Sequence, residues 1–166
     1  MAAAGRLTEA DKKYELQKGE TRRLRRLRDE RARELYEAWV PIRKMVSRQY
    51  SPTVLFHLLG YEGKTPREPM PLRSVCRVIV ERARDESIEL PAPRLGMLSF
   101  SREGLAAKLE PLVEALEQAI EAVMLAGREE DVLLMKRDQA WAKLRQVEAG
   151  ITLFLEGLYR AAQLHD

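Results

Sequence analysis

Arginine is the residue type in this chain that is concentrated most strongly in one place. The run RRLRRLR fills positions 22–28, and two further arginines follow at 31 and 33. On a helix with 100° between successive residues, four cations share an arc of about 40°: Arg22, Arg26, Arg33 and Lys44. Guanidinium and ammonium groups in such a row can follow the phosphates of a nucleic acid without reading its bases. The spacing therefore predicts a nucleic-acid-binding face, with Arg25 at its side.

Acidic neighbours weaken this positive field. Their spacing predicts ion pairs along the helix at steps of three or four residues: Arg25–Asp29, Arg26–Glu30, Arg33–Glu37 and Arg31–Glu34. Arg22, Arg28 and Lys44 have no acidic residue at that spacing. Two other interpretations of the basic face stay open, a solvated surface and a contact with an acidic protein partner.

A second, looser set of cations surrounds the middle of the chain. Arg73 and Arg77 lie one helical turn apart, beside an apolar stripe. They would extend the basic face if their helix packed next to the first one. We therefore include both in the predicted nucleic-acid-binding set.

Signs of catalysis or metal binding are lacking in the sequence. Glu110, Glu114, Glu117 and Glu121 form an acidic stripe, but no histidine follows a glutamate at the spacing of di-metal carboxylate bundles. We interpret the stripe as solvated or as paired with basic residues. His57 and Cys76 lie in apolar surroundings that favour a structural role. Without a phosphate loop or a nucleophile motif, we predict a protein that is not an enzyme and has no cofactor.

Two glycines could let another helix come close. Gly150 and Gly157 are seven residues apart and lie within about 20° of each other on a helical wheel, away from the main leucine stripe. Glycines without side chains allow backbones to approach. A contact with another helix or chain and a pair of tolerated, exposed glycines are both compatible with this pattern.

The composition indicates the elements that must position these residues. Among the 166 residues, 33% are charged and 6% are aromatic, with nine glycines and one cysteine. This composition is typical of long helices. We predict a single all-α domain over 1–166, a bundle of about five helices. We also predict a cytoplasmic protein with no membrane-spanning segment.

The basic face lies on a long helix predicted over 9–50, after about eight disordered residues. Gly19 is a plausible start for its ordered part, and Pro41 predicts a kink or a break. Its apolar stripe predicts a buried face: Leu24, Leu27, Leu35, Ala38, Trp39, Ile42, Met45 and Val46. Residues 1–50 carry 14 basic and eight acidic residues, a net charge of +6.

The segment 51–100 is predicted to hold a short buried helix, a proline-rich loop and a middle helix. Ser51 and Pro52 are typical of a helix start, and Gly60 is placed to end that helix in the left-handed conformation. The middle helix would begin near Pro71 and be stopped by Pro91 and Pro93. Its predicted apolar face is Leu72, Val75, Cys76, Ile79, Val80 and Ala83.

The last segment, 101–166, is predicted to form an antiparallel helical hairpin. One helix would begin after Ser101 or at Pro111 and end at Gly127, and the other would cover 128–164. The second helix would be about 55 Å long, more than a compact bundle needs. We therefore expect it either to bend or to project towards a partner.

Two functions follow from these patterns. The first is a non-enzymatic helical subunit that binds nucleic-acid backbone, within a larger assembly. The alternative is a helical scaffold or adaptor with no nucleic-acid role, which binds a protein partner or further copies of itself. Salt-dependent binding to random-sequence nucleic acid would separate the two.

Overall fold

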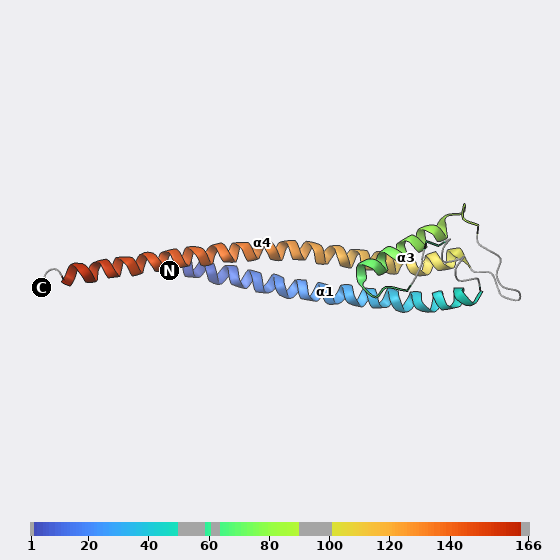
Figure 1. Cartoon of the computed structure of the whole chain (residues 1–166), viewed down its shortest axis with the longest axis horizontal. Coiled ribbons are helices and arrows are strands. Elements are labelled where there is room, and N and C mark those ends of the chain that lie inside the picture. Colours follow the sequence, from blue (N-terminus) through green and yellow to red (C-terminus); the bar gives the residue numbers. More distant parts are fainter. Residues whose placement is uncertain (1, 50–58, 61–63, 90–100, 164–166) are drawn as a thin grey trace. The chain divides into compact units, whose positions relative to one another are not determined.

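The computed structural model describes residues 2–49, 59–60, 64–89 and 101–163, and the regular elements within these ranges are all helices (Figure 1). The all-α prediction is confirmed. Three helices lie in the described residues, fewer than the five predicted. The short helix expected at 52–59 lies almost wholly outside them. No helix among the described residues is both long enough and apolar enough to cross a membrane.

Helix α1, Ala2–Gln49, is a single uninterrupted helix. The prediction of disorder is wrong for residues 2–8, and so is the predicted start at Gly19, because the helix already includes Ala2 and continues through Gly19. Pro41 lies inside the helix and does not break it. Pro41 and Glu37, whose carbonyl loses its helical donor, are both exposed, so water can satisfy that carbonyl.

Helix α3, Pro69–Arg84, is the predicted middle helix with shifted ends. Pro69 occupies its first turn. The helix ends before Pro91 because the Asp85 carboxylate accepts hydrogen bonds from the Ser87 backbone N–H (3.0 Å) and from its hydroxyl (2.6 Å), which turns the chain. Gly60 has the expected left-handed conformation, with φ of 68°. A Cβ atom there would lie 2.8 Å from Val78 Cγ1, so this position requires glycine.

Helix α4, Arg102–Gln163, replaces the predicted hairpin by one helix of 62 residues. The Ser101 hydroxyl caps its start by accepting a hydrogen bond from the Gly104 N–H at 3.0 Å. Pro111 is exposed and is accommodated inside the helix. Gly127 does not end the helix, because it is not in the left-handed conformation that would terminate it. The hairpin prediction is therefore wrong.

The chain divides into two compact units. Unit 1 contains Met1–Arg22 and Leu125–Asp166, and unit 2 contains Arg23–Met124. Unit 2 thus holds the second part of α1, all of α3 and the first part of α4. Unit 1 holds the first part of α1 and the last part of α4.

Unit 2 has an apolar core to which all three helices contribute. Trp39 of α1, Cys76 of α3 and Leu109 of α4 are fully buried in it. Burial raises the pKa of the Cys76 thiol to about 12, as expected for a core cysteine. Five of the six residues on the predicted apolar face of α3 are buried, and the sixth, Val75, is half-buried against the core. On α1, Leu35, Ile42 and Val46 are also buried, whereas Leu27 and Met45 are exposed.

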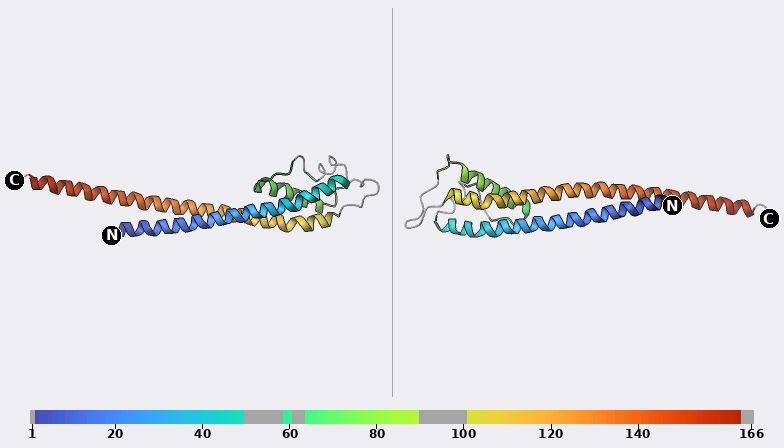
Figure 2. Two further views of the ribbon diagram at one scale, coloured as in Figure 1. Left: turned by 90° about the horizontal axis from the view of Figure 1, so that it is seen from below. Right: turned by 180° about the vertical axis from the view of Figure 1, so that it is seen from behind.

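Unit 1 is an antiparallel pair of helices (Figure 2). Several contacts between these helices are polar. The Thr21 hydroxyl lies 3.4 Å from the Ala126 carbonyl, and further along the pair the Arg137 guanidinium lies 4.6 Å from the centre of the Tyr14 ring. Asp11 Oδ1 is 4.0 Å from Arg137 Nε. Only Leu7, Thr21 and Ala126 are buried among the described residues of this unit.

Candidate nucleic-acid interface

The predicted cations of α1 are all exposed to solvent. Arg25, Arg26, Arg33 and Lys44 lie on unit 2, and Arg22 lies on unit 1. No residue in the described part of the chain forms an ion pair with any of the five, so the predicted pairs to Asp29, Glu30 and Glu37 do not form. Their charges therefore face water.

Two other ion pairs do form along this helix. Arg31 binds Glu34 at 2.8 Å, as the spacing predicted. Arg28 binds the adjacent Asp29 at 2.6 Å, although it has no acidic residue at helical spacing. These two cations are neutralised locally, and the positive surplus of α1 comes from the exposed set instead.

Arg73 and Arg77 of α3 are held by an acidic residue of α4. Arg77 donates two hydrogen bonds to the Glu117 carboxylate, one of them from Nε at 3.1 Å, and Arg73 Nη1 lies 3.3 Å from it. These contacts hold the pKa of Glu117 below its usual value, chiefly through the hydrogen bond from Arg77. Both arginines link α3 to α4, so neither belongs to the candidate interface.

A basic hollow lies elsewhere on unit 2, between α1 and the segment that leads into α3. Its volume is about 660 Å³. Four of its cations were not in the predicted set, namely Arg43, Arg48, Lys64 and Arg67, and the fifth is Lys44. The remaining lining residues are Tyr36, Val40, Ser47 and Thr65. No described carboxylate lines this hollow, which we call the basic groove.

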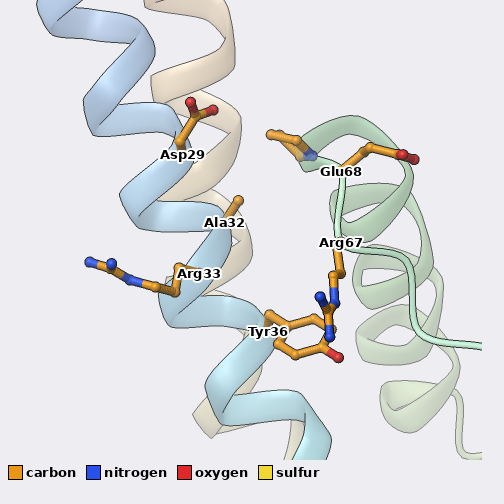
Figure 3. Close-up of a pocket in the computed structure, with 7 residues that line it drawn as sticks. Asp29, Ala32, Arg33, Tyr36, Arg67 and Glu68 are labelled. Atoms are coloured by element: carbon orange, nitrogen blue, oxygen red, sulfur yellow. The ribbon is translucent and has the colours of Figure 1, made fainter.

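Contacts between the two sides fix the shape of the basic groove. Arg43 Nη1 donates a hydrogen bond to the Thr65 hydroxyl at 3.0 Å, joining α1 to the segment before α3. The Arg67 guanidinium lies 5.7 Å from the centre of the Tyr36 ring, a cation–π distance. Figure 3 shows Arg67 reaching from this segment towards Tyr36 on α1. The aromatic ring and two of the cations are therefore held in place before any ligand binds.

A second hollow adjoins the first and shares Tyr36 and Arg67 with it. Its volume is about 480 Å³, and Asp29 and Glu68 are among its lining residues (Figure 3). These carboxylates make it a poorer site for an anion. The exposed row Arg25, Arg26 and Arg33 belongs to the same stretch of α1 as this hollow.

The arrangement suits the binding of phosphate groups. Five cations around one hollow can neutralise several phosphates, and Arg and Lys differ in that Arg can bind two oxygens at once. Among the described residues, no cluster of His, Cys, Asp and Glu could hold a metal ion. His57 and His165 lie outside the described residues.

Part of this groove was visible in the sequence. Tyr36, Val40, Arg43, Lys44, Ser47 and Arg48 recur at helical spacing, so they share one face of α1. Lys64 and Arg67 could not be placed on that face, because they belong to a loop whose position depends on the fold. No protein-family profile matches the chain, and no curated protein or solved structure matches it.

Proposed function

We propose that this protein binds the phosphate backbone of nucleic acids, without base specificity, at the basic groove of unit 2. The observation that supports the proposal best is a hollow with five cations and no described carboxylate in its lining. A non-specific interaction of this kind depends on the number of phosphates neutralised and on little else.

The exposed cations of α1 extend the site along the helix. Arg26 and Arg48 are 22 residues apart, which corresponds to about 33 Å of helix, close to one turn of a DNA duplex. Arg33 and Lys44 lie between them on the same side of the helix, as does the acidic Glu37. A nucleic-acid strand that follows this row of cations from Arg26 would reach the basic groove near Lys44 and Arg48.

Aromatic contact plays a minor part in this proposal. Trp39 is buried in the core and is not available for stacking on a base. Tyr36 is half-buried and already faces Arg67. Backbone charge therefore accounts for the binding, and base identity should have little effect.

The test is binding of the full chain to labelled single- and double-stranded DNA and RNA of random sequence, followed by fluorescence anisotropy. With about five phosphates neutralised, affinity should fall by on the order of 10²–10³ between 50 and 200 mM salt. Absence of binding at 50 mM salt would contradict the proposed function.

A charge-reversal pair tests the site. Arg48→Glu with Lys64→Glu should weaken binding by on the order of 100-fold at low salt, because two phosphate contacts are lost and two repulsions are added. The matched control is Lys108→Glu with Arg128→Glu, two exposed cations that do not line the basic groove and change the net charge equally. Equal losses in the two pairs would assign the effect to net charge and contradict the site.

A further inference from the structure

The last 20 described residues of α4 form an apolar helix with almost no cover. Every residue of the range 145–163 is exposed, including large apolar side chains. Phe154 is 65% exposed and Ile151 is 54% exposed. The other large members of this set are Val147, Leu153, Leu155, Leu158 and Tyr159. An apolar surface of this kind, concentrated on one element, is typical of an association site.

The exposed apolar residues continue the face of α4 that α1 covers. In unit 1 the buried and half-buried positions of α4 recur at alternating steps of four and three: Ala126, Glu130, Leu133, Arg137, Ala140 and Leu144, with Gly127 and Leu134 beside this row. The same steps lead on to Val147, Ile151, Phe154 and Leu158, which we call the open seam. This spacing is that of a coiled coil.

The described part of α1 reaches only to the start of the open seam. Thr21 lies against Ala126, and Asp11 lies against Arg137, so the antiparallel pairing brings Ala2 close to the level of Gln146. Figures 1 and 2 show α4 continuing beyond the start of α1. None of the described residues covers the open seam, although it is more apolar than the covered part of the same face.

We propose that the open seam binds the same segment of a second copy of this chain, with the two helices antiparallel. The segment 144–163 carries two basic and two acidic residues, so two copies meet without net repulsion. The pairing is centred between Thr152 and Leu153. It places Ile151 opposite the second copy's Phe154, and Val147 opposite its Leu158, so that each layer contains two large apolar side chains.

The antiparallel direction follows from the position of α1. A parallel second helix would run back along residues 126–144 of α4, where α1 already occupies the same face. An antiparallel helix runs in the opposite direction, away from the residues of α4 that α1 covers.

The two glycines of this segment fit the same pairing. Gly150 would face the second copy's Gly157 at the edge of the seam, where missing side chains let the helices approach closely. In the single chain, a Cβ atom added at either position would meet nothing within 4 Å. Neither glycine is therefore required by the described residues of its own chain.

The association is tested by sedimentation velocity of the full chain across a concentration series. We expect a reversible monomer–dimer equilibrium. Ile151→Glu with Phe154→Glu should raise the dimer Kd at least about 100-fold, because two central apolar layers receive buried charges. The control, Leu153→Glu with Tyr159→Glu, adds the same charge at exposed positions that face away from the seam and should change Kd less than about threefold.

All four of these side chains are exposed in the single chain, so none of the variants should disturb unit 2, and circular dichroism verifies this. A chain that stays monomeric up to several hundred micromolar would overturn the proposal. So would equal weakening by both pairs of variants, or a defined trimer.

The glycines provide a test in which stability and association change in opposite directions. Gly150→Ala with Gly157→Ala should increase helicity, since alanine favours helices, and yet weaken the dimer by on the order of tenfold through overpacking. Gly5→Ala with Gly19→Ala, also open in the structure, should increase helicity and leave the dimer unchanged. Equal dimer affinity in both pairs would contradict the close approach of the two helices.

Direction is tested with introduced cysteines and oxidised glutathione. Val147→Cys mixed with Leu158→Cys should give a cross-linked heterodimer, and either variant alone should give little cross-linking, because only the mixed pair shares a layer. Cys76 is buried and has a pKa of about 12, so it should not react. A Val147→Cys homodimer as the main product would show a parallel pairing and contradict the proposed direction.

Discussion

The same two helices build a core in unit 2 and fail to build one in unit 1. Leu35 of α1 and Leu109 of α4 are fully buried in unit 2, where α3 covers them from a third side. In unit 1 only α1 and α4 are present, and Arg137 and Tyr14 occupy the space between them. Two helices bury only a few side chains between them, such as Leu7, Thr21 and Ala126, whereas three helices enclose a continuous core. A third element, and not a change in helix quality, therefore separates the two units.

Replacing a buried leucine by alanine should lower the free energy of unfolding by different amounts in the two units. Leu109→Ala in unit 2 should lower the free energy of unfolding by about 2–5 kcal/mol, since it leaves a cavity in a closed core. Leu7→Ala in unit 1 should cost about 1 kcal/mol, because its surroundings can close around the smaller side chain. Urea unfolding followed by circular dichroism measures both, and equal costs would break the comparison.

A smaller loss of stability is expected from replacing Glu117, the residue of α4 that binds two arginines of α3. Glu117→Gln should destabilise unit 2 by about 1–2 kcal/mol at pH 7, through weaker hydrogen bonds to Arg77 and Arg73. The pKa of Glu117 is lowered in the folded chain, so its contribution is complete above the usual value of 4.5 and is lost as the pH falls through the lower, folded value.

The difference in stability between wild type and Glu117→Gln should therefore be constant above about pH 5 and shrink at lower pH. Unfolding curves at pH 7, 5, 4 and 3 provide the measurement. A difference that does not change with pH would argue against the ion pair as its source.

The polar contact of unit 1 should contribute less. The Thr21 hydroxyl, which is buried, donates to the Gln17 carbonyl at 3.0 Å, and Ala126 O lies 3.4 Å away. Thr21→Val keeps the shape and removes the donor, so we expect a loss of about 1 kcal/mol or less. The loss should appear in amide exchange of unit 1 and leave that of unit 2 unchanged. Slower exchange in unit 1 would contradict this account of the contact.

The smallest expected effect is a change in the salt dependence of nucleic-acid binding when one arginine is removed from either unit. Arg48→Ala in unit 2 should reduce the slope of log affinity for nucleic acid against log salt by about 1, whereas Arg128→Ala in unit 1 should leave it unchanged. Both residues are exposed, and only Arg48 lines the basic groove. Identical slopes for the two variants would remove the distinction between the units as binding surfaces.

The apolar periodicity of the sequence predicted most of the residues that form the core of unit 2. The same periodicity did not show that the apolar residues of unit 1 are largely exposed. Five of the six residues on the predicted face of α3 are buried, and in α4 Leu109, Val113 and Leu116, which also recur at helical spacing, are buried too. Ile151 and Leu158 have the same spacing but are exposed. A helical period shows that a face favours burial and does not show what covers it.

The prediction of a hairpin over 101–166 was wrong because a local sequence signal does not show how the rest of the chain packs. Gly127 is compatible with a helix end and with a helix interior, and the choice depends on where the rest of the chain packs.

The basic groove was predicted in part. Lys44 came from the spacing on α1, whereas Lys64 and Arg67 join it only through the path of the chain before α3.

The central claim, that unit 2 has its own core and that the open seam of unit 1 is covered by a second copy, is tested most directly by hydrogen–deuterium exchange at several concentrations of the full chain. Core amides of unit 2 should be protected equally at every concentration. Amides of 144–163 should exchange rapidly below the dimer Kd and become protected above it. Protection of 144–163 that does not depend on concentration, whether strong or absent throughout, would contradict the account.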